Sequence, residues 1–282
     1  MEDRVWLKVM AWLAEDQTAS KRFRFSDDAI LRVVLWAILH DRPMCWACRG
    51  EHWPEAQRPE QLPHPSTVSR RCRRAELRVR MLEIHRQVVG QLSPGRRYGA
   101  LDGRSLLVGG SSKDPEARAG RAVGGLGRGY KLHSLVDGQR FFVCWEVQPL
   151  NVAEPTVGRR LLAAAPAWLS RIVADGNYDS MKLHAAAAES GRRRYTPLRQ
   201  NRVGRRRQRR RLQLWRLWQH PVGQRLLASR DDIERTFGHS SNLGFGFKGL
   251  PPWARRQHRV ERWMWGKVLL YHAYLATKPH AA

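Results

Sequence analysis

Residues 172–183, IVADGNYDSMKL, pass from an apolar run to a polar turn and then to a helical pattern. The apolar run at 172–174 is typical of a buried strand, and Asp175-Gly176 is a turn signal that ends it. A helix is expected to begin at Ser180. A carboxylate at the end of a buried strand has two interpretations. Asp175 either stabilises the turn through its side chain or helps to hold a metal ion.

The segments on either side of this stretch predict an α/β fold, a mixed sheet with helices packed on it. Residues 98–109, YGALDGRSLLVG, predict a strand, and Asp137-Gly138 between two apolar runs predicts a β-hairpin. Strands and helices then alternate, which is typical of this class. The other expected elements are a glycine-rich loop at 109–129, a helix near 155–165, a strand at 192–197, a helix from 231 that ends near Gly238, and a helix at 254–276.

The N-terminal third of the chain predicts an all-helical region. Ser26, followed by two aspartates, is a suitable N-cap, and Ser66 opens a further helical pattern. Helices are expected at 1–15, 26–41 and 66–89, with a proline-rich connector at 54–65 that cannot be helical. We therefore predict two domains, 1–95 and 96–282, with a basic insertion at 199–218 in the second.

Composition restricts the class of protein and of partner. The 282-residue chain has a formal net charge of +26, which is typical of nucleic-acid binding; a membrane surface is the alternative. Four cysteines are too few for a disulfide scaffold in a chain of this length. The N-terminus lacks the cleavage pattern of a signal peptide, and the apolar stretch 263–276 is too short to span a bilayer. We expect a reducing, cytoplasmic location.

Two basic segments are expected to contact DNA. Residues 199–211 hold eight arginines and no acid, so phosphate would relieve their mutual repulsion; a solvated loop is the alternative. Residues 67–74, TVSRRCRR, fit a recognition helix in a helix-turn-helix-like unit or the basic face of a bundle helix. The predicted DNA-binding residues are Arg70, Arg71, Arg73, Arg74, Lys131, Arg199, Arg202, Arg205, Arg206, Arg207, Arg209, Arg210, Arg211 and Arg230.

The Cys45-x-x-Cys48 pair, with His52, His64 and Cys72 nearby, suggests a zinc site as one alternative. The sequence lacks a second pair of closely spaced ligands of the kind that zinc sites commonly have. Small buried side chains are therefore the favoured interpretation of these cysteines.

Three acidic residues stand where strands and helices can bring them together. Asp102 lies within the first strand of the second domain, Asp175 follows a later strand, and Glu234 lies on a helix. Clustered carboxylates repel each other unless a cation lies between them, and Mg²⁺ prefers such oxygen ligands. Each has an alternative. Asp102 and Asp175 could be turn residues beside glycines, and Asp231 shares a helix face with Glu234.

The motifs ALDGRSL (100–106), GYKLHSLVD (129–137), VADGNYDS (173–180) and RDDIERTFG (230–238), in this order, resemble insertion-sequence transposases with a DDE catalytic domain. The resemblance covers roughly residues 98–275. Upstream, FSDDAILRVVLWAIL (25–39) and HPSTVSRRCRR (64–74) are similar to the N-terminal helical region of such proteins.

The resemblance implies a ribonuclease H-like fold in which Asp102, Asp175 and Glu234 are the catalytic, metal-binding triad. It implies two Mg²⁺ or Mn²⁺ ions, nicking at terminal inverted repeats, and attack of the freed 3′-hydroxyl on target DNA. It further implies double-stranded DNA as the partner, a homodimer in the DNA complex, a helical DNA-binding or dimerisation region at 1–95, and association with the nucleoid.

The resemblance is incomplete around the glutamate. Many relatives carry Tyr, Arg and Lys there; Arg230 occupies the Arg position, whereas Leu227 and Ser241 occupy the other two. This difference concerns contacts with DNA ends more than the triad. Two other functions remain open, a catalytically inactive DNA-binding protein derived from such an enzyme and a ribonuclease H-like nuclease that acts on RNA.

Overall fold

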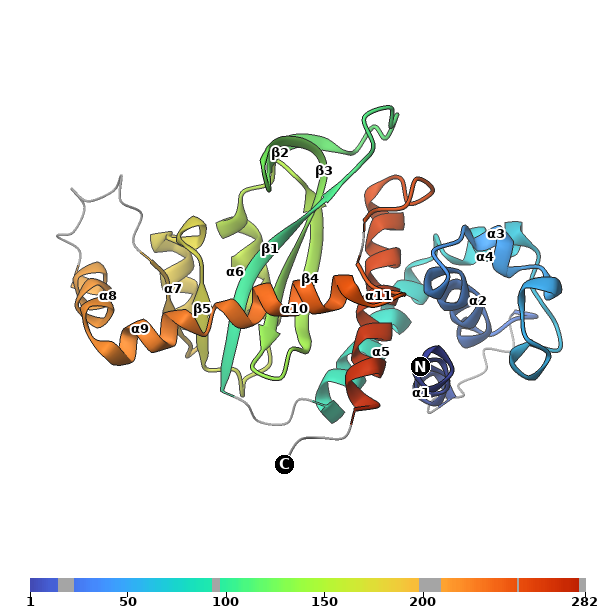
Figure 1. The fold of residues 1–282 in the computed structure, drawn as a ribbon, viewed down its shortest axis with the longest axis horizontal. Helices are drawn as coiled ribbons and strands as arrows, with labels where there is room; N and C mark the ends of the chain where they lie inside the picture. The colour runs from blue at the N-terminus through green and yellow to red at the C-terminus, as the bar shows by residue number, and fades with distance from the viewer. Residues whose placement is uncertain (15–22, 93–96, 198–208, 248, 279–282) are drawn as a thin grey trace. The chain divides into compact units, whose positions relative to one another are not determined.

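The structure is a computed structural model that describes residues 1–14, 23–92, 97–197, 209–247 and 249–278, without the side chains at 209–211, 214 and 215. The chain divides into two compact units (Figure 1). The first contains the described residues of Met1–Leu92, Leu243–Phe247 and Glu261–Ala282. The second contains those of Ser93–Asn242 and Lys248–Val260.

The first unit is helical, as the sequence predicts. The Oγ of Ser26 accepts a hydrogen bond from the backbone N–H of Ala29 at 3.1 Å, which confirms the predicted N-cap. The elements are α1 (Glu2–Ala14), α2 (Asp27–Leu39), α3 (Met44–Ala47), the 3₁₀ turns η1 (Gly50–His52) and η2 (Glu55–Gln57), α4 (Pro65–Arg71), α5 (Ala75–Leu92) and the larger part of α11 (Gln257–Ala276).

The single helix expected at 66–89 is wrong, because α4 and α5 are separate helices. The backbone carbonyl of Cys72, at the end of α4, accepts a hydrogen bond from Arg262 at 2.7 Å. In a continuous helix, this carbonyl would accept a hydrogen bond from the backbone N–H four residues further along. The N-cap also differs. The imidazole of His64, and not Ser66, accepts from a first-turn N–H group.

The C-terminal helix α11 packs within the first unit from Glu261 onward. The indole N–H of Trp265 donates to the carbonyl of Met81 in α5 at 2.8 Å, and the buried Lys267 pairs with Asp41 at 2.8 Å. The structural division therefore differs from the predicted domain 96–282, in which this segment belongs to the second domain. Sequence distance hides such a return of the chain to an earlier unit.

The second unit contains a six-stranded mixed sheet, which confirms the predicted α/β class. The strand order is β2-β3-β1-β5-β6, and β4 pairs with β3. β1 and β5 are parallel, as are β5 and β6, and the other pairs are antiparallel. The strands are β1 (Tyr98–Leu107), β2 (Arg118–Ala122), β3 (Gly125–Asp137), β4 (Phe142–Pro149), β5 (Arg171–Ala174) and β6 (Arg193–Tyr195).

The predicted hairpin at Asp137-Gly138 is confirmed as the turn between β3 and β4. The Asp137 carboxylate accepts from the backbone N–H groups of Gln139 and Phe141, each at 2.9 Å. The glycine-rich loop expected at 109–129 is wrong in its second half. β2 and β3 form a hairpin there, and the turn between them uses Gly124 at φ +86°.

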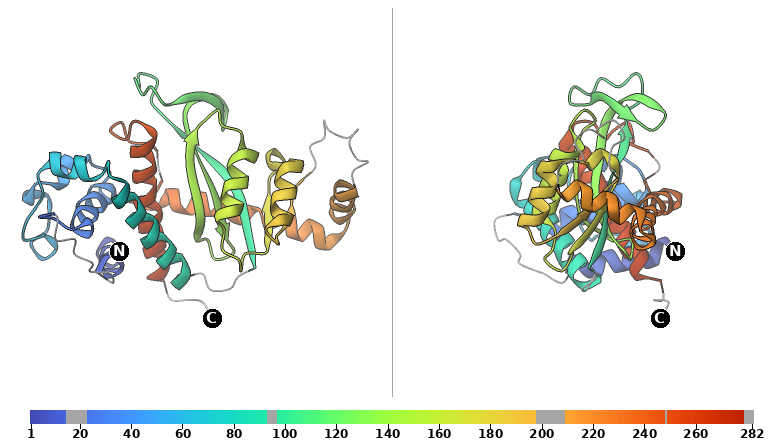
Figure 2. Two further views of the ribbon diagram at one scale, coloured as in Figure 1. Left: turned by 180° about the vertical axis from the view of Figure 1, so that it is seen from behind. Right: turned by 90° about the vertical axis from the view of Figure 1, so that its left-hand side faces the viewer.

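Helices cover both faces of this sheet. α6 (Glu154–Ala164) and α7 (Met181–Glu189) lie on one face, where Leu101 and Ala174 belong to their apolar core. α10 (Asp231–Asn242) crosses the other, and the ring of Phe237 lies 6.1 Å from that of Phe142 (Figure 1; Figure 2). α10 continues past Gly238, where the sequence predicts its end. The remaining helices are α8 (Arg209–Gln219), α9 (Pro221–Ala228) and the 3₁₀ turn η3 (Gly176–Tyr178).

None of the helices in the described part of the chain is both long and apolar enough to cross a bilayer.

Candidate active site

The parallel pairing of β1 with β5 places Asp102 and Asp175 at adjacent positions. Leu101 pairs with Ala174, and each aspartate is the next residue along its segment. Side chains of an extended segment alternate between the faces of a sheet. Leu101 and Ala174 face α6 and α7, and Asp175 keeps an extended backbone. Both aspartates therefore project toward the face that α10 crosses.

The carboxyl group of Asp102 is in an environment that disfavours its charge. Its pKa is raised from 3.8 to about 7, chiefly by burial and in part by the charges of Asp175 and Glu154. The backbone N–H of Gly103, which donates to Oδ1 at 2.7 Å, and the charge of Arg230 act in the opposite direction. A cation beside this carboxyl would favour its ionised form.

Asp175 shows the turn chemistry that its sequence suggests. Its Oδ1 accepts from the backbone N–H of Asn177 at 2.8 Å, which caps η3, and its Oδ2 accepts from the Asn177 side chain at 2.9 Å. These bonds fix the orientation of the carboxylate beside Asp102. The two interpretations of Asp175, turn residue and site residue, are therefore compatible. The helix that follows begins where the sequence predicts, since Ser180 is the N-cap of α7.

Glu234 lies in the first turn of α10, on the same side of the sheet as the two aspartates. Arg104 anchors this helix to β1, since its Nη1 donates to the carbonyl of Phe237 at 2.8 Å. The Glu234 side chain is 56% exposed, and it accepts from Nη2 of Arg230 at 2.9 Å. The third predicted carboxylate is thus on the helix that crosses this face, but it is bonded to a basic neighbour.

Glu154, at the start of α6, is a further carboxylate of this region that the sequence analysis missed. It pairs with Lys131 at 2.6 Å, and both side chains are largely buried. Its Oε2 is buried and has no hydrogen-bond partner within the described residues. The only signal in the sequence is an acid at a helix start, which is too common a pattern to mark a site.

His133 and Tyr178 lie together on the α6 side of the sheet. The Nδ1 of His133 is 3.4 Å from the Tyr178 hydroxyl. The pKa of His133 is lowered to about 3, chiefly by burial and in part by the positive charges of Lys131 and Arg160. Burial also raises the pKa of Tyr178 well above 10. Both groups are therefore neutral at physiological pH and provide polar support without charge.

The two aspartates fit a divalent cation through their chemistry. They are neighbouring hard oxygen donors, and a cation would offset both the burial and the negative neighbours that raise the pKa of Asp102. In the part of the chain that the structure describes, no three His, Cys, Asp or Glu side chains are arranged so that they could hold a metal ion. The structure thus brings two predicted ligands together and leaves the third, Glu234, with Arg230.

Two of the predicted DNA-binding residues have other roles in the structure. Arg71 is buried, pairs with Asp27 and donates to the carbonyl of Phe25 at 2.8 Å, so its guanidinium supports the first unit. Lys131 donates to Glu154 and is only 13% exposed. Local sequence cannot distinguish these buried cations from their exposed neighbours.

The other predicted DNA contacts have varied positions. Arg70 and Arg73 are exposed, Arg74 is half-buried over the ring of Phe23, and Arg230 is half-buried with Glu234. Arg209, Arg210 and Arg211 begin α8, but their side chains are outside the described part. Arg199, Arg202, Arg205, Arg206 and Arg207 lie outside the described residues altogether.

The cysteines near the N-terminus pack against the protein chain. The Sγ of Cys48 donates to the carbonyl of Met44 at 3.3 Å, and the Sγ of Cys72 is 3.9 Å from the Met44 sulfur. Burial raises the pKa of Cys48 to about 11, with further contributions from Cys45 and Cys72. Burial thus disfavours the thiolate of Cys48 in the metal-free protein.

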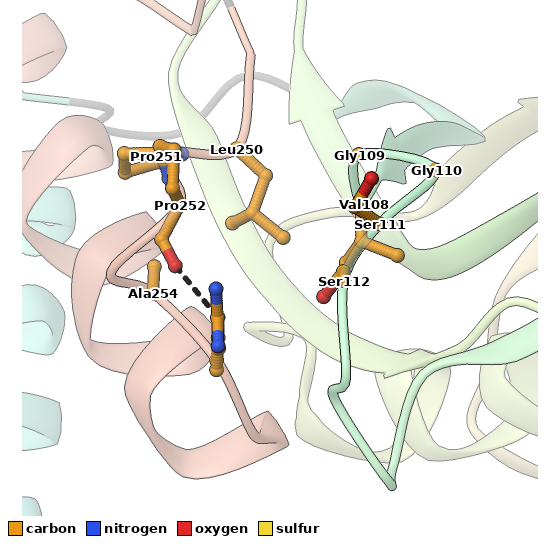
Figure 3. Close-up of a pocket in the computed structure, with 10 residues that line it drawn as sticks. Val108, Gly109, Gly110, Ser111, Ser112, Leu250, Pro251, Pro252 and Ala254 are labelled. Atoms are coloured by element: carbon orange, nitrogen blue, oxygen red, sulfur yellow. Dashed lines mark hydrogen bonds between the residues drawn. The ribbon is translucent and has the colours of Figure 1, made fainter.

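A hollow of about 370 Å³ lies elsewhere in the second unit, between the loop after β1 and the segment before α11 (Figure 3). The guanidinium of Arg255 donates to the carbonyl of Pro252 at 3.0 Å beside it. No acid, histidine or cysteine is among the described residues that line it, and it therefore offers no acid-base or metal chemistry. Those residues are Val108, Gly109, Gly110, Ser111, Ser112, Leu250, Pro251, Pro252, Ala254 and Arg255.

Comparison with known proteins gives one family. The family model for the transposase DDE domain matches residues 93–272, a range that contains the sheet, α10 and all three predicted carboxylates. No match to the chain is found among curated proteins.

Proposed function

The chain belongs to the transposase DDE domain family, and from this premise we propose that it nicks DNA at transposon terminal inverted repeats and transfers the freed 3′-hydroxyl into target DNA. Its mixed sheet flanked by helices is consistent with the ribonuclease H-like fold of such enzymes. The proposed substrate is double-stranded DNA, and the proposed working form is a homodimer in the DNA complex, because two ends must be joined. A nucleoid-associated, cytoplasmic location follows from this substrate.

One observation carries the proposal, the parallel register that sets Asp102 beside Asp175 under α10. Burial of the Asp102 carboxyl, together with repulsion from Asp175 beside it, raises its pKa to about 7. Carboxyl groups with strongly shifted pKa values are common at functional sites, which supports a functional role for this pair. The formal net charge of +26 supports a polyanionic substrate.

The proposed roles follow from the positions of the side chains. Asp102 and Asp175 would hold Mg²⁺ or Mn²⁺, and Glu234 would join them after leaving Arg230, which is then available to a phosphate. Two such ions, when bound, stabilise the attacking and leaving oxygens of a phosphodiester displacement. Asn177 keeps the Asp175 carboxylate oriented through two hydrogen bonds, and Arg104 keeps α10 against β1.

The proposal is tested by cleavage of a DNA duplex that carries the terminal inverted repeats of the element encoding this chain. With Mg²⁺, wild type is expected to nick at the repeat ends. Asp102→Asn, Asp175→Asn and Glu234→Gln are each expected to lose at least about 100-fold in rate, because each removes a metal-binding oxygen charge. Asp231→Asn, an exposed acid on the same helix, is the matched control and should retain activity.

The alternative is a protein that binds DNA without cleaving it. It is supported by the pairing of Glu234 with Arg230 and by the lack of a three-ligand group among the described acids. A wild-type chain that binds the repeats and never nicks them would establish that alternative. Retained cleavage in Glu234→Gln, with loss in Asp231→Asn, would transfer the third role to Asp231. Cleavage of an RNA–DNA hybrid in preference to duplex DNA would identify a nuclease of the same fold.

A further inference from the structure

The first unit contains a cavity of about 600 Å³ that plays no part in the proposed chemistry. It lies among the start of α1, the end of α2 and the turns η1 and η2. The residues that line it are Glu2, Asp3, Trp6, Trp36, Leu39, His40, Trp46, Glu51, His52, Trp53, Pro54 and Gln57. We refer to this cavity as the aromatic pocket.

Stacked rings form the walls of the aromatic pocket. Trp46 stacks on His52 with 4.5 Å between centroids and 10° between planes, and Trp36 stacks on Trp53 at 4.5 Å and 14°. The indole N–H of Trp36 donates to the carbonyl of His52, and that of Trp53 donates to the carbonyl of Ala47. Both indole N–H groups are therefore already bonded to backbone carbonyls. The aromatic walls offer π faces to a ligand, and such faces attract cations.

The polar groups of the aromatic pocket also favour a cationic donor. Glu2, Asp3 and Glu51 line it, and none of the described lining residues is Lys or Arg, in a chain of net charge +26. Arg49 lies 3.8 Å from Glu51 at the exposed rim, and Asp3 accepts a hydrogen bond from the Gln57 side chain at 2.9 Å. The Nε2 of His40 and the Oε1 of Gln57 are buried without a hydrogen-bond partner among the described residues. Burial lowers the pKa of His40, so its imidazole is neutral at pH 7 and can accept a hydrogen bond.

We propose that the aromatic pocket binds a guanidinium group. A guanidinium is planar, so it can lie flat on the outer face of a stacked ring pair; it carries positive charge for the acidic lining; and its N–H groups are donors for the unpaired acceptors. An ammonium group meets the charge requirement but cannot stack. The group has two possible sources, a free small molecule or an arginine side chain on a second copy of this arginine-rich chain.

The test is isothermal titration of the full chain with L-arginine amide, and with L-citrulline amide as the neutral isostere. Arginine amide is expected to bind at least tenfold more tightly than citrulline amide. Glu51→Gln, an exposed position that should not disturb folding, is expected to weaken arginine amide at least threefold. Glu55→Gln is the matched control, because Glu55 is an exposed acid in η2 that does not line the pocket. It should leave binding unchanged.

Sedimentation then identifies the source. If a second copy supplies the guanidinium, arginine amide and Glu51→Gln will each reduce self-association. If a free molecule is the ligand, titration will show binding while self-association stays the same. Equal binding of the arginine and citrulline amides, absence of arginine amide binding, or equal effects of Glu51→Gln and Glu55→Gln would overturn the proposal.

Discussion

The protonation state of one residue, Asp102, links the stability of the protein to cation binding at the proposed site. The Asp102 carboxyl is buried beside Asp175 and near Glu154, and its pKa is about 7. Near pH 7 it therefore exists partly as the neutral acid when no cation is present. Stability favours that neutral form, whereas binding of a cation requires the ionised one. The same carboxyl should thus reduce stability in the free protein and contribute to it when a cation is bound.

The first prediction concerns the pH dependence of stability without divalent ions. Between pH 4 and pH 7 the native state keeps the Asp102 proton that the unfolded chain, with the ordinary pKa of 3.8, has already released. The free energy of unfolding therefore falls as pH rises through this window. Asp102→Asn removes this loss. The variant should be more stable than wild type by about 1–3 kcal/mol above pH 8 and equal to it below pH 4.

Urea unfolding at each pH measures this difference. Asp231→Asn, at an exposed position, should follow the wild-type curve over the whole range. Parallel curves for Asp102→Asn and wild type would contradict the raised pKa.

The second prediction adds Mg²⁺ at pH 8. A ligand that binds only the native state raises the free energy of unfolding, by about 2.7 kcal/mol at a concentration 100 times its Kd. Mg²⁺ should therefore raise the melting temperature of wild type and leave Asp102→Asn and Asp175→Asn unchanged. Calorimetric melting with Mg²⁺ and with EDTA measures the effect. Equal shifts in wild type and both variants would place the ion elsewhere.

At the scale of elements, α10 matters because it carries Glu234 over the face that holds the aspartates. The third prediction is that Arg104→Met loosens this helix, since the Arg104 guanidinium donates to the Phe237 carbonyl at 2.8 Å. Loss of a hydrogen bond from a charged donor should cost about 1–3 kcal/mol of unfolding free energy. Nicking should fall by more than the lost folded fraction, because Glu234 is no longer held in position.

Arg235→Met is the matched control for this variant. Arg235 lies on the same helix, is exposed, and makes a surface ion pair with Asp232 at 3.3 Å. Pairs of this kind contribute about 0–1 kcal/mol. Equal losses of stability and nicking in the two variants would show that α10 does not depend on Arg104.

Elements governed by local chemistry are the ones that the sequence predicted. The Ser26 cap, the Asp137 turn and the strand before Asp175 each depend on residues within a few positions. At the break between α4 and α5, which was not predicted, the Cys72 carbonyl bonds to Arg262, a residue far along the chain. Glu154 was missed for the same reason, because only the folded sheet brings it near Asp102.

At the scale of the whole molecule, charge has two opposite distributions. The chain has 51 basic and 25 acidic residues, yet neighbouring positions of the sheet in the second unit hold a pair of aspartates. The arginines favour anions, and the aspartate pair would be relieved by the cation proposed above. A DNA substrate with divalent ions would supply both at once. DNA binding alone would account for the basic residues but not for the aspartate pair. The carboxylates therefore favour an enzyme over a DNA-binding protein without catalytic activity.

The last prediction concerns how DNA binding depends on salt. Each phosphate neutralised by a basic side chain releases counterions, so the logarithm of the binding constant falls with log salt by about 0.9 per contact. Arg70 and Arg73 are exposed in the basic segment, whereas Arg71 is buried with Asp27. Arg70→Gln/Arg73→Gln should therefore reduce the slope by about 2, measured by fluorescence anisotropy of a labelled duplex at several salt concentrations.

Arg70→Lys/Arg73→Lys is the control for this variant, because it keeps both charges and should keep the wild-type slope. Since Arg71 already pairs within the first unit, Arg71→Gln should lower the melting temperature and change the slope little. A slope unchanged by the Gln pair, or a large change from Arg71→Gln in folded protein, would mean that the basic segment of the first unit does not meet DNA through its exposed arginines. The positive charge that binds DNA would then lie elsewhere in the chain.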